Sequence, residues 1–268
     1  MRSEAFAPAK INLTLHVTGQ RADGYHLLDS LVVFADVGDR LWFDDSTSLN
    51  LKVTGRFAGG VPTDQRNLAW RAAEAADVTP HIRLEKNLPH GGGIGGGSAD
   101  AAAVLRRFDA PQAAVDLGAD VPVCLSDAPQ RMRGIGEDLS DVPGVPALDI
   151  VLVTPGVSVH TPDVFRRLVR KDNDGMGVLP TWADRAAFLG WLNEQRNDLQ
   201  APACDTAPAI SAALTALQGA ELARMSGSGS TCFGIYPTGM AAAEAAGRIA
   251  KAQPSWWVCA AKTKGSLS

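Results

Sequence analysis

The first regular pattern along the chain is an alternation of apolar and polar residues that begins after Pro8. It is the period-two pattern of a strand that buries one face. Lys10 and Asn12 fall on its polar face, about 6.6 Å apart along the strand. Taken alone, the segment favours an ordinary strand with one side in solvent. Its apolar positions are Ile11, Leu13, Leu15 and Val17.

The rest of the chain mixes strand-like and helix-like patterns, with a turn at 21–24, and predicts an α+β fold. Asn67 is the expected N-cap of one helix. The predicted strands are 31–35, 40–43, 49–53, 81–86, 149–154 and 256–261, with two more flanking 226–231. The predicted helices are 68–76, 98–108, 163–170, 182–193, 206–217 and 240–251.

The length of 268 residues allows one large domain or two ordinary ones. A stretch rich in Pro and Gly at 141–146 has the composition of a boundary. We therefore predict an N-terminal domain over 1–145 and a C-terminal domain over 146–268.

Composition and charge narrow the classes of protein. A net charge of −4 disfavours a nucleic-acid partner, which needs a positive surface. No apolar run approaches the roughly 18 residues of a membrane span, and the N-terminus lacks the apolar region of a signal peptide. The four cysteines are scattered without zinc-ligand spacing. We expect a soluble cytoplasmic protein with reduced thiols and no membrane partner, and the sequence leaves any metal ligands unassigned.

The strongest local signal is the glycine-rich stretch from Pro89 to Ser98, which holds six glycines between 91 and 97. Glycine lets backbone N–H groups approach a ligand closely, because no Cβ intervenes. The stretch leads into a helix whose first N–H groups have no partner within the helix and whose dipole end is positive. This combination predicts a phosphate site.

Several types of site fit a glycine-rich stretch. A Walker A loop needs Lys before the Ser, but Gly97 stands there. A dinucleotide fingerprint is formally present, with Asp116 twenty residues after its last glycine, yet the sequence around Asp116 is helical. A flexible surface loop is a further alternative. We favour a nucleoside-triphosphate loop whose lysine comes from another segment.

The glycine-rich stretch is one of three motifs that together resemble the GHMP kinases. The segments 8–13, 91–102 and 225–231 are similar to the family's first, second and third motifs, in the right order and spacing. Within the family, the segments 18–26, 117–123, 134–137 and 197–199 resemble the diphosphocytidyl-methylerythritol kinases. The segment between Phe108 and Gly118 is shorter than is usual in the family, but it leaves the matched positions intact.

This resemblance implies a two-domain GHMP kinase fold, with an N-terminal domain like ribosomal protein S5 domain 2 and a ferredoxin-like C-terminal domain. It also implies that ATP, with Mg²⁺, donates its γ-phosphoryl group to the 2-hydroxyl of a cytidine-diphosphate-linked methylerythritol. That reaction belongs to the non-mevalonate route to isoprenoid precursors. Two rival hypotheses are a GHMP kinase for another alcohol, such as homoserine, mevalonate or a sugar, and a non-catalytic binding protein.

The resemblance also implies roles for individual residues. Asp120 matches the general base and Lys10 its partner lysine. Ser98 is expected to cap the helix and to contact phosphate or Mg²⁺. Substrate is expected at Asn12, Tyr25, His26 and Phe165, with Tyr25 stacking on cytosine, His26 recognising its edge and Phe165 as the opposing ring. The ATP site takes Pro89, Gly91, Gly92, Gly93, Gly95, Gly96, Gly97, Ser98 and Ala99, and the third motif supports it through Gly227, Ser228, Gly229 and Ser230.

Overall fold

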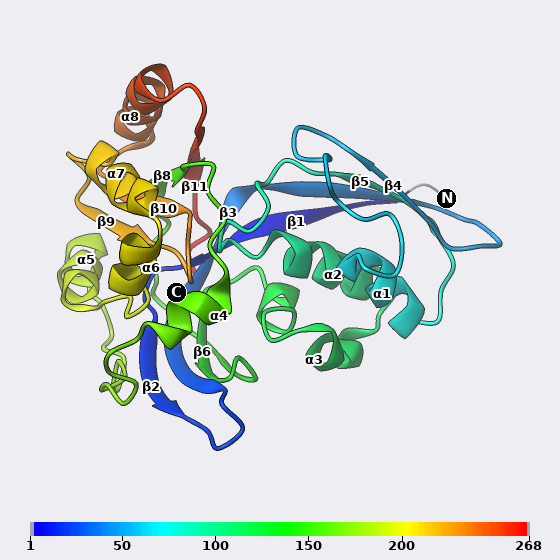
Figure 1. Ribbon diagram of the computed structural model, residues 1–268, viewed down its shortest axis with the longest axis horizontal. Helices are drawn as coiled ribbons and strands as arrows, with labels where there is room; N and C mark the ends of the chain where they lie inside the picture. The colour runs from blue at the N-terminus through cyan, green and yellow to red at the C-terminus, as the bar shows by residue number, and fades with distance from the viewer. Residues whose placement is uncertain (1–2, 267–268) are drawn as a thin grey trace. The chain divides into compact units, whose positions relative to one another are not determined.

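The computed structural model describes residues 3–266 (Figure 1). The chain groups into two compact units, each assembled from separate stretches of sequence. Among the described residues, unit 1 comprises 3–10, 37–90 and 95–127, and unit 2 comprises 11–36, 91–94 and 128–266. Strands β1 (Ser3–Asn12) and β3 (His26–Asp44) contribute to both units. The domain division after residue 145 assumes contiguous pieces of chain, and it stays a prediction.

Unit 1 places its helices on one side of its strands (Figure 1). Its elements are β4 (Asn50–Thr54), α1 (Leu68–Ala75), β5 (His81–Glu85), α2 (Gly96–Arg107), α3 (Ala114–Leu117) and 3₁₀ turns at Pro111–Ala113 and Val123–Leu125. β4 runs parallel to β5, and the end of β3 pairs antiparallel with β5. Helix α1 begins where predicted, because the Asn67 side chain accepts a hydrogen bond from the Ala69 N–H at 2.9 Å. Small alanines line both α1 and α2, which lets the two helices pack together.

Unit 2 contains a hairpin of β2 with the first part of β3. β2 spans His16–Gln20, and the strands that join this hairpin are β6 (Gln130–Gly134) and β7 (Asp138–Asp141). The turn predicted between β2 and β3 is confirmed, with the Gly24 N–H donating to the Arg21 carbonyl at 3.0 Å. β6 pairs antiparallel with Leu28–Val32 of β3, and β7 continues from β6.

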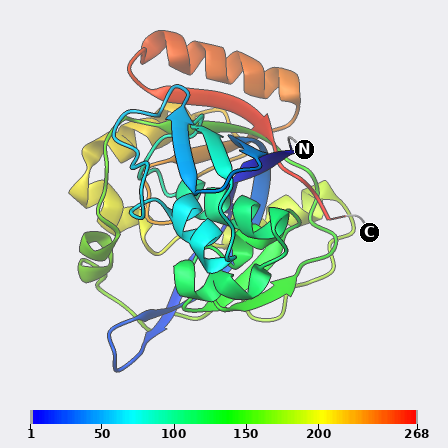
Figure 2. The same ribbon diagram turned by 90° about the vertical axis from the view of Figure 1, so that its right-hand side faces the viewer.

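The second sheet of unit 2 has four antiparallel strands in the order β11-β8-β10-β9. Its strands are β8 (Asp149–Thr154), β9 (Leu222–Met225), β10 (Cys232–Tyr236) and β11 (Trp257–Lys262). Its helices are α4 (Thr161–Arg166), α5 (Arg185–Glu194), α6 (Gln200–Thr206), α7 (Pro208–Ala216) and α8 (Gly239–Ala252). Helices lie between β8 and β9, and α8 lies between β10 and β11, which gives the βαββαβ order of ferredoxin-like folds. Figures 1 and 2 show α8 lying beside β11, on which it packs.

The first strand differs from the expectation in length and in exposure. β1 ends at Asn12, and the chain resumes strand pairing as β2 at His16. Every residue from Ala7 to Val17 is buried, including Lys10. The expectation of a wet face was wrong, because alternation records which side chains are polar and does not record whether polar side chains find partners inside.

Two predicted strands, 31–35 and 40–43, are in fact parts of the single strand β3. The sequence between them resembles a turn, but Gly38 instead lets β1 lie close to β3. A Cβ at Gly38 would lie 2.2 Å from the Ala7 carbonyl oxygen. The strands β6 and β7 were missed because both are short and polar.

The helix predicted over 206–217 corresponds to α7, which spans Pro208–Ala216, and the helix α6 before it was not predicted. The two helices are separated at Ala207, whose extended backbone (φ −140°, ψ 94°) is the conformation that a following proline favours.

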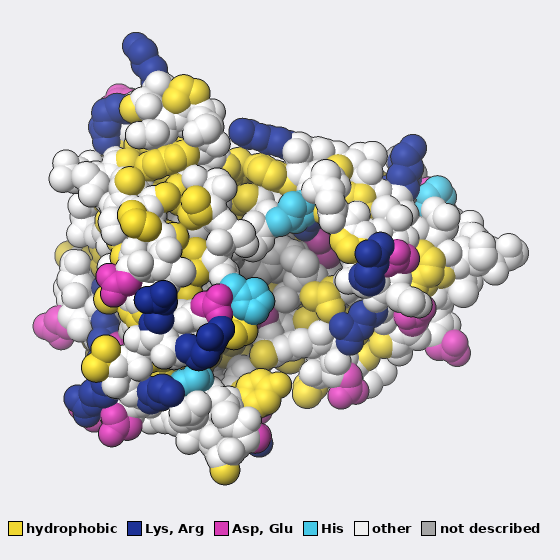
Figure 3. Space-filling model, viewed as in Figure 1, with side chains coloured by type: hydrophobic (Ala, Val, Ile, Leu, Met, Phe, Trp, Pro, Cys, Tyr) yellow, Lys and Arg dark blue, Asp and Glu magenta, His cyan; other side chains and the backbone are white. Residues whose placement is uncertain are grey.

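The surface over α7 and α8 carries many hydrophobic side chains (Figure 3). Both helices are rich in alanine, and small apolar side chains at a surface are ordinary. Within residues 3–266, none of the helices combines the length and the apolar character needed to cross a membrane.

Candidate active site

The structure brings Lys10 and Asp120 together within unit 1. Lys10 lies near the end of β1, and its Nζ lies 2.7 Å from Oδ1 of Asp120. Asp120 belongs to the irregular segment between α3 and the 3₁₀ turn at Val123–Leu125. The lysine side chain is only 4% exposed, whereas the aspartate side chain is 42% exposed. A buried ammonium therefore holds a carboxylate that solvent or a ligand can reach.

The start of α2 lies beside Lys10. The N-cap is Gly95, which adopts a left-handed conformation with φ 67° and leaves no side-chain hydrogen bond on the helix start. A Cβ at Gly95 would lie 3.1 Å from the Cβ of Lys10, so glycine permits this close approach. The uncapped N–H groups and the positive dipole end form an anion site next to the lysine.

Ser98 does not cap the helix, which corrects the expectation. The helix begins at Gly96, so Ser98 lies inside its first turn. A hydroxyl in that position cannot fold back as an N-cap does, because the N-cap residue lies outside the helix with its own backbone geometry. Its predicted contact with phosphate or Mg²⁺ remains a prediction, as do those of Pro89, Ala99 and the glycines.

The tip of the glycine-rich stretch, Gly91 to Ile94, belongs to unit 2 and lies against the third motif. The Thr231 N–H donates to the Gly92 carbonyl at 2.9 Å, and the Ser226 hydroxyl donates to the Gly93 carbonyl at 3.1 Å. A Cβ at Gly93 would lie 2.7 Å from the carbonyl oxygens of both Ser226 and Gly229. The third motif thus fixes this part of the glycine-rich stretch.

Asn12 joins the same part of unit 2. Its backbone N–H donates to the Ser226 hydroxyl at 3.1 Å, and its side-chain nitrogen donates to the Ser30 hydroxyl at 2.8 Å. Its side-chain oxygen is buried and has no hydrogen-bond partner among residues 3–266. Since a buried polar atom usually has a partner, this oxygen keeps an unused capacity to accept a hydrogen bond, and the substrate contact of Asn12 stays a prediction.

The predicted cytidine site is brought together in part. The rings of His26 and Phe165 stack within unit 2, with centroids 4.5 Å apart and planes 20° apart. Burial lowers the pKa of His26, and the nearby Lys171 lowers it further, so the imidazole is neutral at physiological pH. Its Nε2 has no hydrogen-bond partner among the described residues. Tyr25 is 61% exposed and does not join this stack.

The comparisons with known proteins agree with one another. The sequence matches the GHMP kinases N terminal domain over residues 67–111 and the GHMP kinases C terminal domain over residues 180–255. The 4-diphosphocytidyl-2-C-methyl-D-erythritol kinase of Paracoccus denitrificans is 55% identical, with 97% of this chain and 96% of that protein covered. Its counterpart in Ruegeria pomeroyi is 53% identical, with 96% and 98% covered. The chain belongs to the 4-diphosphocytidyl-2-C-methyl-D-erythritol kinase family.

The solved structures support the same assignment of fold. A crystal structure of 4-(cytidine 5'-diphospho)-2C-methyl-D-erythritol kinase has a TM-score of 0.78 and 34% identity, and the match covers 98% of this chain and 100% of that one. The homoserine kinase from Cytophaga hutchinsonii has a TM-score of 0.63 at 18% identity, covering 98% and 94%, which shows a shared fold alone. The predicted α+β, two-domain GHMP kinase fold is confirmed.

The dinucleotide alternative loses its main support in the structure. That fingerprint requires an acidic residue at the end of a strand. Asp116 instead lies in the first turn of α3.

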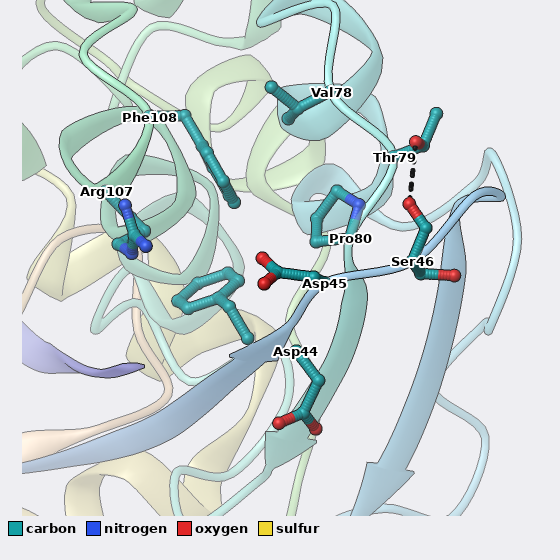
Figure 4. Close-up of a pocket in the computed structure, with 9 residues that line it drawn as sticks. Asp44, Asp45, Ser46, Val78, Thr79, Pro80, Arg107 and Phe108 are labelled. Carbon is teal, nitrogen blue, oxygen red and sulfur yellow. Dashed lines mark hydrogen bonds between the residues drawn. The ribbon is translucent and has the colours of Figure 1, made fainter. Parts of the chain in front are cut away.

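A separate pocket in unit 1, of about 160 Å³, contains none of the predicted site residues (Figure 4). Thr79 donates a hydrogen bond to the Ser46 carbonyl at its rim. Its lining residues are Phe43, Asp44, Asp45, Ser46, Val78, Thr79, Pro80, Arg107 and Phe108.

Sequence reasoning assigned no role to two sets of residues around the glycine-rich stretch, although Asn197 stands in the matched segment 197–199. Asn197 donates from its side chain to the carbonyls of Met225 and Gly227, both at 2.8 Å, and so holds the third motif. Lys86 and Asp100 flank the glycines and meet in the core of unit 1. For Lys86 and Asp100, the one available signal in the sequence was that Asp100 is a charged residue among the alanines of α2. Within residues 3–266, no three His, Cys, Asp or Glu side chains are grouped so as to hold a metal ion.

Proposed function

We propose that the protein transfers the γ-phosphoryl group of ATP to the 2-hydroxyl of 4-diphosphocytidyl-2-C-methyl-D-erythritol, giving the 2-phosphate and ADP. The reaction belongs to the non-mevalonate route to isoprenoid precursors. The observation that carries the proposal is the 2.7 Å pair of Lys10 and Asp120 beside the uncapped start of α2. Family membership at 55% identity supports the choice of substrate.

In this mechanism Asp120 acts as the general base. Its exposed carboxylate accepts the hydroxyl proton as the alcohol oxygen bonds to the γ-phosphorus and the bond from that phosphorus to the bridging oxygen of ADP breaks. Lys10 holds the carboxylate in place through the 2.7 Å ion pair, and it supplies a fixed positive charge where negative charge develops. The free N–H groups at the start of α2 orient the transferred phosphate.

Mg²⁺ would reach the site together with ATP, and it would supply charge neutralisation for the phosphates. Such sites use one or two protein oxygens and several waters, and they do not need a preformed cluster of ligands. Ser98, in the first turn of α2, has the hydroxyl best suited to this duty.

Recognition of the substrate base would rest on unit 2. Because the His26 and Phe165 rings stack directly on each other, a cytosine would lie beside this pair and not between its rings, and the neutral imidazole can donate or accept a hydrogen bond at the edge of the base. The free side-chain oxygen of Asn12 would accept a bond from a hydroxyl of the alcohol. The exposed ring of Tyr25 is available to cover the base once it is bound.

The test is ADP release by purified protein with Mg²⁺ and ATP. Four alcohols are compared: 4-diphosphocytidyl-2-C-methyl-D-erythritol, homoserine, mevalonate and galactose. We expect turnover with the cytidine-linked alcohol alone. Turnover confined to another alcohol would overturn the substrate assignment, and no turnover with any of the four would favour a binding protein.

A further inference from the structure

A buried cluster of three charged side chains lies in the core of unit 1. Lys86 follows β5 directly, Asp39 comes from β3 and Asp100 from α2. The Lys86 Nζ donates to Asp100 Oδ2 at 2.7 Å and also to Asp39 Oδ2. The three side chains are 4%, 3% and 0% exposed for Lys86, Asp100 and Asp39 respectively. Three segments that are distant in sequence are thus joined at one ammonium group.

The cluster lies against the residues on both sides of the glycine-rich stretch. Before the glycines, Asp39 Oδ1 accepts hydrogen bonds from the backbone N–H groups of Asn87 and of Leu88, the latter at 2.9 Å. After the glycines, Asp100 lies in the second turn of α2. A Cβ at Gly96, the first residue of that helix, would lie 3.4 Å from the Lys86 Nζ. The ammonium therefore lies next to the turn whose N–H groups face a phosphate in the proposed function.

Stability alone is a poor reason for such a cluster. Taking charges out of water is expensive, and apolar replacements of buried ion pairs are often neutral or stabilising. Two carboxylates share one ammonium here, and Asp100 Oδ1 has no hydrogen-bond partner among residues 3–266. Burial raises the pKa of Asp100 to about 7, against the opposing pull of Lys86. The cluster does fix the positions of three segments, β3, the end of β5 and α2, relative to one another.

We propose that Lys86, Asp39 and Asp100 are positioning residues that hold the first turn of α2 in place for the phosphates of ATP. The inference rests on the proposed function. The cluster need not contact ATP, because it acts through the backbone of Leu88, Gly96 and the turn that follows. A shift of about 1 Å in such a turn is enough to weaken binding that depends on backbone N–H groups.

Two substitutions at one position separate geometry from charge. Asp100→Glu keeps the charge but adds a methylene to a side chain that is only 3% exposed, so the helix start is expected to move. Asp100→Asn keeps the shape and removes the charge. We expect Asp100→Glu to raise the Kd and KM for Mg·ATP about tenfold, with the KM for the alcohol and the kcat at saturating ATP changed less than about twofold. Asp100→Asn is expected to raise the Kd for Mg·ATP by less than Asp100→Glu does, because its side-chain oxygen can still accept a hydrogen bond from Lys86.

The measurements are calorimetry with Mg·ATP alone and steady-state kinetics. Thr238→Ala, which removes the side-chain cap of α8 in unit 2, serves as a control for a general loss of stability. If Asp100→Glu does not fold, Lys86→Arg is the second geometric variant, since a guanidinium cannot place one nitrogen between both carboxylates. It too is expected to weaken ATP binding about tenfold.

The outcomes distinguish this inference from the proposed function. Wild-type protein that fails to bind Mg·ATP would overturn the proposed function. Wild-type protein that binds Mg·ATP while Asp100→Glu binds equally well would overturn the inference alone. A loss in Asp100→Asn as large as that in Asp100→Glu would also overturn it, because the charge and not the geometry would then matter.

Discussion

At the scale of single residues, the pair of Lys10 and Asp120 makes the sharpest prediction. Asp120→Asn preserves size but cannot accept a proton, so kcat is expected to fall about 100- to 1,000-fold, while the Kd for Mg·ATP stays within about twofold. Single-turnover kinetics and calorimetry measure the two effects. Asp116→Asn, an exposed carboxylate four residues earlier in α3, is the matched control and should keep full turnover. Undiminished kcat in Asp120→Asn would remove Asp120 from the mechanism.

The residues that sequence could and could not place differ in a physical way. Lys10 and Asp120 could be paired because both stand in motifs that mark one site. Lys86 and Asp39 stand outside any motif, and periodicity does not tell which buried side chains from distant segments meet. The capping error at Ser98 has a local origin: a glycine at positive φ began the helix earlier than hydroxyl chemistry suggested.

At the scale of elements, the contact between the glycine-rich stretch and the third motif explains why Gly93 must be glycine. Gly93 has φ 70°, and a Cβ would collide with two carbonyl oxygens at 2.7 Å. Gly93→Ala is therefore expected to cost about 3 kcal/mol of the free energy of unfolding, from strain plus overpacking.

Urea denaturation measures this loss, and Gly219→Ala in the same unit is its control. Gly219 also has a positive φ, of 90°, but a Cβ there would meet nothing within 4 Å. It isolates the backbone strain, at about 1 kcal/mol. Equal losses in the two variants would show that the packing between the two motifs is looser than the structure describes.

Elements with strong periodicity were predictable, and their boundaries followed local chemistry. The strand at 149–154 and the helix after Asn67 emerged within a residue of expectation. The continuous strand β3 could not be foreseen, because Gly38 reads as a turn unless the close approach of β1 is known. β6 was not predicted, because its sequence is polar and its polar side chains find partners only on other strands, as Arg131 does with Asp29 on β3.

At the scale of the whole molecule, the free energy of unfolding is expected to depend on an ion pair that joins three segments of unit 2. Arg131 on β6 donates two hydrogen bonds to Asp29 on β3, at 2.8 and 2.7 Å, and the Met176 N–H donates a third at 2.7 Å. Burial alone would raise the pKa of Asp29, but these hydrogen bonds outweigh it and hold the pKa below its ordinary value of 3.8.

The sign of the resulting acid dependence follows from that shift. A carboxyl group whose pKa is lower in the folded state contributes stability that is fully present above its unfolded pKa of about 3.8, and that is lost as pH falls through the folded value. Asp29→Asn should lower the free energy of unfolding at pH 7 by about 2 kcal/mol and flatten its fall below pH 4. Urea titrations from pH 7 to pH 2 measure both.

Asp138→Asn breaks the exposed pair of Arg133 and Asp138 beside it, and should change the same curve by no more than about 0.5 kcal/mol. If the free energy of unfolding falls as steeply below pH 4 in Asp29→Asn as in the wild type, other carboxylates cause the loss of stability in acid.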